Sequence, residues 1–528
     1  MLSLLLAIVS GLLFAWSFPS VAQGWLAFIA LAPLLVVVVR AKNTRHAFVL
    51  GWIAHATSWL VMVPWVVRVM SHYGGLPYAA GVAIFVAMSL YLGLYGALFA
   101  ALVHRLRLGM TFLPWLLVPL TWAAIEYART YLLSGFPWNL IATALVDYSS
   151  LIQINRFAGP YLVGALVLLP ATVAAWWITQ RPPGIARVLV VGSLGIVLLV
   201  WWGTGLVASK LNARPNASEP MTAALLQPNI TQQMRWDEAN VIAIYQRMIA
   251  MTEEAARKGA QIVIWPESTV PLSYTQTDFF RASIEELSKR HNIDIILGSV
   301  ATDPERSTRL WNSAFLASNG TTIGHYDKIR LVPFGEYVPM RRVLFFAEKL
   351  VRAVGEFEFG TNEKPLVGKL AYGPAICYEI VYPQITRTQV RNGASVIVTI
   401  TNDAWYDGTS APAQHLAQAR LRAVEDDRYL LRAATTGISA FVDPTGRMLE
   451  SIPMGRDGII YAKFQARKTI TPYVRFGDWF AWMACGVVLI ALALRRVPRS
   501  LGVPRSSSGG DFSEELRGTE EPRGTKTK

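Results

Sequence analysis

The segment AYGPAICYE at residues 371–379 decides the fold class of this chain. Its first part, Ala371–Ile376, is a short and mostly apolar run, which predicts a buried β-strand. Similar runs occur at Ala223–Gln227, Gln261–Trp265, Ile293–Gly298, Ser395–Thr401, Leu430–Thr435 and Ser439–Asp443. Helical patterns alternate with them at Glu238–Lys258, Phe279–Arg290, 383–391 and 411–426. Nearly continuous apolar strands between helices predict an α/β domain over residues 215–470, in which helices cover the sheets.

The chain as a whole is strongly apolar. Hydrophobic residues make up 53% of the 528 residues and charged residues 16%, and the mean hydropathy is +0.35. This composition excludes the disordered, collagen-like and small disulfide-rich classes. A membrane-spanning helix needs about 20 mostly apolar residues. Eight spans are predicted, at residues 2–18, 25–39, 47–70, 78–103, 111–133, 161–179, 188–207 and 479–494.

The predicted spans define a membrane domain, residues 1–210, and a last span that follows the α/β domain. The α/β domain is therefore predicted to be inserted between the seventh and eighth spans. Residues 2–18 have the apolar core of a signal peptide, but no basic residue precedes them and Phe18-Pro19 offers no convincing cleavage site, so we retain them as a span. Residues 501–528, which combine Ser, Gly and mixed charges, predict a disordered tail.

Basic residues gather on alternate connections between the predicted spans. Residues 1–207 contain ten Lys or Arg and two acidic residues, so they carry +8 of the formal net charge of +14. The basic groups are Arg40/Lys42/Arg45, Arg105/Arg107, Arg181/Arg187 and Arg495/Arg496/Arg499. Because cytoplasmic loops are rich in Lys and Arg, we expect these groups and both termini on the cytoplasmic side of a bacterial inner membrane, and the α/β domain in the periplasm. Charges scattered between apolar runs indicate membrane topology rather than nucleic-acid binding.

Glu126 and Arg129 form a charged pair inside a predicted span. They are three residues apart and therefore share one face of a helix. Charges buried in a membrane are costly unless they are paired. We expect a structural ion pair that supports the loop Ser134–Asn139 (SGFPWN); a role at a lipid portal is the alternative.

Three features of the α/β domain suggest chemistry, although each alone is common and a lone cysteine at a strand end is more often a core residue. Cys377 ends a strand before a turn, a geometry that exposes its thiol and directs the backbone N–H of Tyr378 at an oxyanion. Glu267 follows a predicted strand, where it would act as a general base with a raised pKa. Lys328 stands in an irregular loop punctuated by Pro and Gly, of the kind that often carries function. A thiol, a carboxylate and an ammonium are the groups that covalent acyl transfer requires.

The motifs around these residues resemble those of a known family. Glu267 in IWPES, Lys328 in YDK and Cys377 in AICYE are similar to the Glu-Lys-Cys triad of the nitrilase superfamily, with 61 and 49 positions between successive members. More narrowly, the segments LVPFGEYVP, SGFPW and TNDAW resemble the apolipoprotein N-acyltransferase family; they lie at 331–339, 134–138 and 401–405. The resemblance covers roughly residues 1–496.

The resemblance implies a fold and an activity. The fold is a membrane domain of eight helical spans with an inserted, nitrilase-like αββα sandwich. The activity is ping-pong N-acylation of bacterial lipoproteins: an acyl chain passes from a membrane phospholipid to Cys377 as a thioester, and then to the α-amine of a diacylglyceryl-cysteine. Glu267 is the implied base, and Lys328 the implied cation that stabilises thiolate and oxyanion. No cofactor is implied, we expect a monomer, and no metal is predicted because the histidines of the domain, His415 among them, are isolated.

The same resemblance implies four supporting residues, which are Trp236, Glu336, Tyr378 and Glu379. Glu336 is expected to hold Lys328 in place, and Glu379 to make a structural contact. Trp236 either lines the acyl path or fills a core. The segment Asn402–Trp405 is expected to form a wall of the pocket.

Two other functions are compatible with parts of the sequence. A membrane-tethered carbon–nitrogen hydrolase would cleave amides or nitriles with the same three residues, although eight spans exceed what a tether needs. A transporter or assembly scaffold would need intramembrane charges and broken helices in paired positions, whereas most charges here lie in loops. A fatty acyl adduct on Cys377 would distinguish the three functions.

Overall fold

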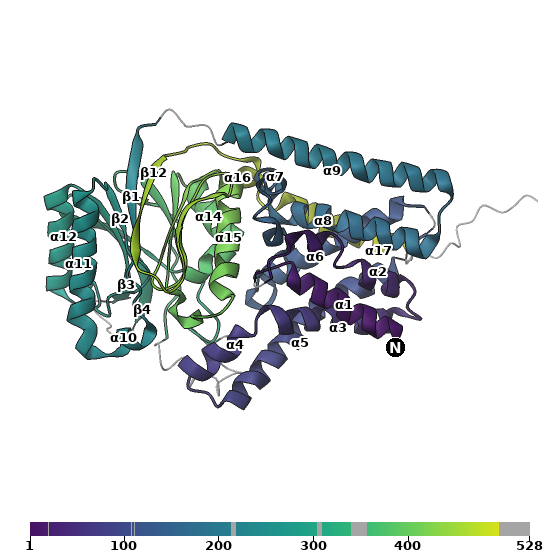
Figure 1. The fold of residues 1–528 in the computed structure, drawn as a ribbon, viewed down its shortest axis with the longest axis horizontal. Coiled ribbons are helices and arrows are strands. Elements are labelled where there is room, and N and C mark those ends of the chain that lie inside the picture. The colour runs from purple at the N-terminus through teal and green to yellow at the C-terminus, as the bar shows by residue number, and fades with distance from the viewer. Residues whose placement is uncertain are drawn as a thin grey trace, which may run out of the picture.

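The computed structural model describes residues 1–19, 21–106, 108–109, 111–212, 218–303, 309–338 and 356–495, so the tail predicted at 501–528 lies outside the described residues. The described chain forms two parts, a sandwich of β-sheets and a bundle of helices. They lie side by side along the longest axis of the molecule (Figure 1).

The sandwich consists of two six-stranded sheets. In spatial order, the first sheet contains β12 (Gly458–Gln465), β1 (Pro220–Gln227), β2 (Ile262–Ile264), β3 (Asp294–Thr302), β4 (Leu310–Ser318) and β5 (Thr321–Asp327). The second contains β11 (Met448–Ile452), β10 (Ser439–Val442), β9 (Leu430–Ala434), β8 (Val396–Thr401), β7 (Ala371–Ile376) and β6 (Leu366–Val367). The strands β1–β2–β3 and β7–β8–β9 are parallel, and the other neighbours are antiparallel.

Helices cover the outer face of each sheet (Figure 1). α11 (Val241–Arg257) and α12 (Asp278–His291) cover the first sheet, and α14 (Pro383–Arg391) and α15 (Ala411–Asp426) cover the second. The space between the sheets is filled by apolar side chains from both, among them Leu225, Ile264, Ile376, Val398 and Leu431. The predicted αββα architecture is therefore confirmed.

The strands that the sequence did not reveal are antiparallel ones. Parallel strands buried on both faces are mostly apolar, as in β2 and β8, and produce nearly continuous runs. β5 and β11 are edge strands in which at most one side chain is buried, and β12 alternates between buried and more exposed positions. In β4 the apolar run is interrupted by Asn312 and Ser313. These strands are defined by their partners in the sheet rather than by their own composition.

The helical part is apolar. Its helices are α1 (Leu2–Trp16), α2 (Ala32–Val39), α3 (Thr44–Met62), α4 (Trp65–Arg68), α5 (Tyr78–Arg105), α6 (Leu117–Tyr131), α7 (Ser149–Ile152), α8 (Asn155–Gln180), α9 (Gly184–Asn212) and α17 (Trp479–Leu494). Among the described residues, α5, α8 and α9 are long and apolar enough to span a membrane. A fourth candidate is formed by α3 with Trp65–Tyr73 if this pair, bent by 54°, is one span; α1, Gly24–Val39 and α17 are apolar but shorter.

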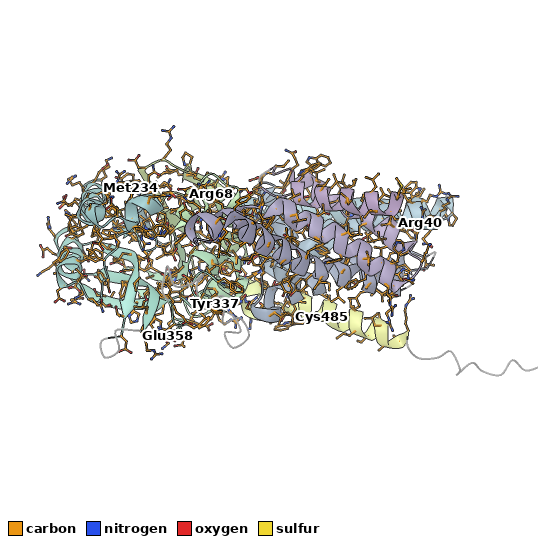
Figure 2. The ribbon with its side chains drawn as sticks, turned by 90° about the horizontal axis from the view of Figure 1, so that it is seen from below. Arg40, Arg68, Met234, Tyr337, Glu358 and Cys485 are labelled. Carbon is orange, nitrogen blue, oxygen red and sulfur yellow. The ribbon has the colours of Figure 1, made fainter. Side chains whose placement is uncertain are left out.

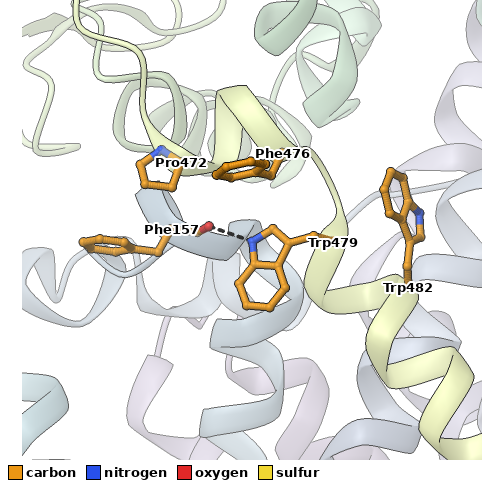
Figure 3. A pocket seen from close by; sticks show the side chains of 5 residues that line it. All are labelled: Phe157, Pro472, Phe476, Trp479 and Trp482. Atoms are coloured by element: carbon orange, nitrogen blue, oxygen red, sulfur yellow. Dashed lines mark hydrogen bonds between the residues drawn. The ribbon is translucent and has the colours of Figure 1, made fainter.

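The last helix returns from the sandwich to the bundle. α17 packs on α6 and α8 through Phe480, Ala481 and Ala484. Between α16 (Pro472–Phe476) and the start of α8 lies an apolar pocket of about 560 Å³. Figure 3 shows its lining residues, which are Phe157, Pro472, Phe476, Trp479 and Trp482. The indole N–H of Trp479 donates to the carbonyl oxygen of Phe157 at 3.0 Å, which ties α17 to α8.

The charged pair in α6 supports the loop that follows it, as predicted. Arg129 Nη2 lies 3.7 Å from Glu126 Oε1, and both residues are buried. Arg129 Nη1 donates to the carbonyl oxygens of Phe136 at 2.8 Å and Trp138 at 2.7 Å. Glu126 accepts from the backbone N–H of Ile141 at 2.8 Å. The expectation of a structural ion pair is confirmed, and it fixes the position of Trp138.

Candidate active site

Glu267, Lys328 and Cys377 come from three strands in two sheets. Glu267 follows β2 and Lys328 follows β5, two strands that run in the same direction in the first sheet, whereas Cys377 directly follows β7 of the second. The three residues are buried, with exposed fractions of 6%, 1% and 7%. Gly298 of β3 makes room for the backbone of Glu267, because a Cβ there would lie only 2.7 Å from Cα of Glu267. The sandwich therefore brings together the three predicted residues.

Two further side chains complete a buried polar cluster around Lys328. Lys328 Nζ donates to Glu336 Oε1 at 2.9 Å and to Glu267 Oε1 at 3.3 Å. Asn312 Nδ2 donates to the same two oxygens, at 2.7 Å to Glu267 and 2.9 Å to Glu336. Glu336 also accepts from the backbone N–H of Val332 at 2.8 Å, which anchors its own loop. Glu336 thus contacts Lys328 as predicted, while Asn312 was missed although it is a polar residue inside an apolar strand.

The electrostatic environment keeps Glu267 ionised. Burial by itself raises the pKa of this carboxyl, but the ammonium of Lys328 and hydrogen bonds from the Asn312 amide and the Asn402 backbone N–H lower it below its usual value. The prediction of a raised pKa for Glu267 is therefore wrong, because these donors come from distant parts of the chain. Burial likewise opposes the charge on Lys328, but the two neighbouring carboxylates raise the pKa of its ammonium well above the usual value.

The thiol of Cys377 is protonated in this environment. Burial, and then the negative charge of Glu267, raise the pKa of the Cys377 thiol. Cys377 and Glu267 influence each other's pKa, so the thiol and the carboxylate lie near one another in the buried site. A thiol that loses its proton only as it attacks needs a nearby base, and Glu267 is the ionised carboxylate beside it.

Glu379 ties the turn at Cys377 to the loop that carries Lys328. Its side chain is fully buried and accepts hydrogen bonds from both segments. The donors are the backbone N–H groups of Ile376 at 2.8 Å, Ile329 at 2.6 Å and Arg330 at 3.1 Å, and the Tyr326 hydroxyl at 2.9 Å. Glu379 therefore makes the structural contact that we expected.

A second network, which the sequence did not predict, holds the backbone of Cys377 itself. Cys377 adopts a positive φ of 51°, which is strained for a residue with a side chain. His415 Nε2 lies 3.0 Å from its carbonyl oxygen, and Arg432 Nη2 lies 3.1 Å from His415 Nδ1 and 2.7 Å from Asp403 Oδ2. Because a carbonyl oxygen can only accept, Nε2 donates to Cys377, while Nδ1 lies between the Arg432 guanidinium and Asp403 Oδ1, which is 3.3 Å away. Burial, and then the charge of Arg432, lower the pKa of His415, consistent with a neutral ring.

His415 is thus a hydrogen-bonded core residue. Its significance was hidden because its partners lie 38 and 17 positions away in the sequence. Among the described residues, no three His, Cys, Asp or Glu side chains converge as a metal ion would require.

The sequence as a whole matches known proteins. A family model described as carbon-nitrogen hydrolase matches residues 222–471, and one described as apolipoprotein N-acyltransferase N-terminal domain matches residues 10–173. The chain is 37% identical to an apolipoprotein N-acyltransferase from Geobacter metallireducens, over 93% of this chain and 95% of that protein. It belongs to the apolipoprotein N-acyltransferase family.

Other proteins are similar over the whole chain or over the sandwich. A relative from Methylococcus capsulatus, also an apolipoprotein N-acyltransferase, is 33% identical over 94% of this chain and 97% of that protein. The crystal structure of an amidase from Nesterenkonia sp. is similar at 21% identity and a TM-score of 0.37, over 48% of this chain and 93% of that chain.

In this member of the apolipoprotein N-acyltransferase family, the helical part reaches the candidate site. Trp138 stacks on Tyr378, with ring centroids 6.4 Å apart and planes at 19°, and on His415 at 5.7 Å and 25°. Its indole N–H donates to Gln414 Oε1 at 2.8 Å. Tyr378 directly follows Cys377, so a residue of the helical part packs against the turn that carries the thiol.

Trp236 lies in a second contact between the two parts. It ends α10 (Gln232–Trp236) and is 47% exposed, so it does not fill a core as one of our expectations had it. Its ring packs edge to face against Tyr73 at 6.0 Å and Trp405 at 5.8 Å. Tyr73, from the bent helix pair of the bundle, also donates to the carbonyl oxygen of Ala404 at 3.0 Å. Arg68 of the same bent pair lies at this junction with the sandwich (Figure 2).

Proposed function

We propose that this chain N-acylates bacterial lipoproteins, taking the acyl chain from a membrane phospholipid and carrying it as a thioester on Cys377. The observation that carries this proposal is the junction at Trp138, where a residue of the apolar helical part stacks beside the turn of the candidate nucleophile. Both substrates of such an enzyme are lipids, and a nucleophile at the boundary with a membrane domain can meet both. No cofactor takes part in this scheme, and the chain acts as a monomer.

In the first half-reaction, Sγ of Cys377 attacks the ester carbonyl carbon while the Glu267 carboxylate takes the thiol proton. Lys328 Nζ carries three hydrogens, of which two point to Glu267 and Glu336, so the third donates to the oxyanion together with the Tyr378 N–H. When the ester C–O bond breaks, Glu267 returns the proton to the departing lysophospholipid oxygen. A thioester remains on Cys377.

In the second half-reaction, the α-amine of the diacylglyceryl-cysteine attacks the thioester carbonyl. Glu267 takes a proton from the attacking nitrogen, the new C–N bond forms and the C–S bond breaks. Glu267 then returns the proton to the thiolate of Cys377, which restores the enzyme. The apolar surroundings exclude water, so the amine is not outcompeted by hydrolysis.

We place Trp236 on the path of the acyl chain. Its ring is half-exposed and belongs, with Tyr73 and Trp405, to an aromatic cluster formed by the bundle and the sandwich together. Large aromatic surfaces at such a boundary suit an acyl chain that leaves the bilayer. The segment Asn402–Trp405 contributes both Trp405 and the backbone N–H that binds Glu267, so it forms a wall of this path.

We further propose eight spans in the inner membrane, with both termini in the cytoplasm and the sandwich, inserted before the last span, in the periplasm. Arg40 Nη2 donates to the carbonyl oxygen of Ile178 at 2.9 Å, so two of the basic connections lie together. Figure 2 shows Arg40 at the end of the bundle remote from the sandwich. This arrangement separates the basic loops from the sandwich by the length of the bundle.

Orientation can be tested with introduced cysteines in a Cys485→Ala background. A membrane-impermeant thiol reagent applied to intact spheroplasts is expected to label Asp457→Cys, in the sandwich, and to leave Arg181→Cys unlabelled. The reverse labelling would contradict the topology.

The reaction is tested with the purified full chain, a phospholipid and a diacylglyceryl peptide in detergent. Mass spectrometry is expected to detect an acyl adduct on Cys377 and, after the peptide is added, an N-acylated product. Cys377→Ala abolishes both, whereas Cys485→Ala retains them. Release of free fatty acid without peptide acylation would favour a membrane-tethered hydrolase, and a wild-type chain without any adduct would favour a transporter or scaffold.

A further inference from the structure

Arg330 is a cation of the candidate site that the proposed mechanism does not use. It follows Lys328 by two positions, and its backbone N–H donates to Glu379 Oε1 at 3.1 Å. Its side chain is partly buried, and the Nε atom is buried with no hydrogen-bond partner. Within the described part of the chain, no carboxylate forms an ion pair with it.

Buried arginines of the sandwich have partners that the Arg330 side chain lacks among the described residues: Arg428 donates to four backbone carbonyl oxygens, and others pair with carboxylates. Ion pairs join Arg387 to Asp478 at 2.8 Å, Arg422 to Glu425 at 2.6 Å, Arg432 to Asp403 at 2.7 Å and Arg467 to Asp427 at 3.0 Å. Burying a guanidinium N–H without an acceptor is unfavourable. We therefore expect a ligand to supply the acceptor that Arg330 Nε lacks.

The surroundings of the guanidinium indicate which ligand. Its Cζ lies 5.5 Å from the centroid of the Tyr382 ring. That ring packs edge to face on Tyr378 at 5.3 Å, and the Tyr382 hydroxyl donates to the carbonyl oxygen of Gly135 in the helical part at 3.2 Å. Arg330 therefore lies one aromatic side chain away from the residue that follows Cys377, on the side where the sandwich meets the helical part.

We propose that Arg330 binds the phosphate of the phospholipid that donates the acyl chain, an inference that rests on the proposed function. In a glycerophospholipid, the ester carbonyl and the phosphate are attached to one glycerol unit, so a cation beside the nucleophile can hold the phosphate while the carbonyl meets Sγ of Cys377. A planar guanidinium suits phosphate because it donates two parallel hydrogen bonds. The acceptor amine needs no such anion site, so Arg330 acts in the first half-reaction only.

The test compares two acyl donors on the full chain in detergent micelles. One is phosphatidylethanolamine, which carries the phosphate, and the other is an uncharged p-nitrophenyl ester of the same fatty acid. Arg330→Gln is expected to raise the KM for the phospholipid about tenfold while the maximal rate of thioester formation stays within about twofold, and to leave the reaction of the uncharged ester unchanged. Arg330→Lys keeps the positive charge but not the planar guanidinium that donates two parallel hydrogen bonds, and is expected to recover part of the affinity for the phospholipid.

Arg309→Gln is the matched control variant. It removes an exposed arginine that pairs with Glu358 outside the candidate site, and we expect the kinetics with both donors to stay unchanged. An equal loss with both donors in Arg330→Gln, or no loss with either, would overturn the phosphate role. If inorganic phosphate competes with the phospholipid in the wild-type chain, and Arg330→Gln abolishes this competition, the site would be assigned to a free phosphate ion instead of a headgroup. A wild-type chain that forms the thioester from the ester but never from a phospholipid would refute the proposed function rather than the role of Arg330.

Discussion

The two helical layers of the sandwich face different surroundings. In α11, which covers the first sheet, the buried residues form one stripe, Ile244, Met248, Thr252 and Ala255, and the opposite side is exposed to solvent. In α15, which covers the second sheet, every residue except Ala413 is buried. The difference arises because α8 and the segment Ile141–Leu145 of the helical part pack on the outer side of α15.

The polar outer face of α15 is a junction between the sandwich and the helical part. The outer side of α15 carries charged and amide side chains that would suit solvent. Arg420 instead donates to Asp147 at 2.6 Å and to the carbonyl oxygen of Val146 at 2.8 Å, both in the helical part. Gln414 donates to the carbonyl oxygens of Pro19 at 2.6 Å and Met62 at 2.8 Å. Glu267 and Lys328 thus come from the first sheet, whose helices face solvent, whereas Cys377 comes from the second sheet, whose helix α15 packs on the bundle.

The largest effect is expected at Lys328, which follows a strand of the first sheet. A substitution there tests the reaction separately from the contact between the sandwich and the helical part. Lys328→Met keeps most of the side-chain length but removes the cation, so thioester formation should slow by roughly 10²–10³-fold. Lys328→Arg should rescue poorly, because a planar guanidinium does not reproduce the position of an ammonium. Single-turnover mass spectrometry of the Cys377 adduct measures this rate. A Lys328→Met chain that acylates normally and fails only at transfer to the amine would move Lys328 to the second half-reaction.

The contact between α15 and the helical part is tested by replacing one glutamine with leucine in α15 and, for comparison, one in α11. Gln414→Leu removes the amide that also accepts from the indole N–H groups of Trp65 and Trp138, leaving buried donors and carbonyls unpaired, at a cost of about 2–4 kcal/mol. Gln246→Leu, on the exposed side of α11, should change the stability by less than about 0.5 kcal/mol. Thermal denaturation in detergent measures both. Equal shifts for the two variants would mean that the junction contributes no more than a surface does.

His415 connects α15 to the nucleophile, so its replacement should affect chemistry more than stability. His415→Leu removes the N–H that holds the carbonyl of Cys377, and we expect thioester formation to slow about tenfold, with partial recovery in His415→Gln, which keeps an N–H donor. Gln418→Leu, one turn away on α15, is the matched control. If the control slows the reaction as much as His415→Leu does, the effect belongs to packing of α15 rather than to the hydrogen bond.

The smallest effect should be that of pH on the first half-reaction. The pKa of Glu267 is lowered and that of Lys328 raised, so the carboxylate takes up a proton only below its usual range and the ammonium loses one only above its usual range. Thioester formation should therefore vary less than about twofold between about pH 6 and about pH 9. Transfer to the peptide should rise about a hundredfold over the same range, because an α-amine has a usual pKa of about 8 and only its neutral form attacks. An acidic fall of thioester formation already near neutral pH would show that Glu267 has a raised pKa after all.

The sequence by itself determined the elements whose composition differs from that of their surroundings. The buried parallel strands, α14 and α15 are found where continuous apolar runs and helical periodicity predict them, and each of the long apolar helices α5, α8 and α9 contains a predicted span. Glu267, Lys328, Glu336 and Cys377 could be identified because strand ends, Pro/Gly loops and local motifs mark them. Each of these signals is contained in a few neighbouring residues.

Only the tertiary structure decided what depends on partners far apart in the chain. The pKa of Glu267 is lowered by Lys328, and then by Asn312 in β4 of the first sheet and Asn402 just after β8 of the second. The hydrogen bond from His415 to Cys377 and the stacking of Trp138 on Tyr378 likewise join distant segments. A polar residue carries no sequence signal that tells whether it meets water, a charge or another domain, because hydrogen bonding and burial are properties of the assembled neighbours and not of the residue itself.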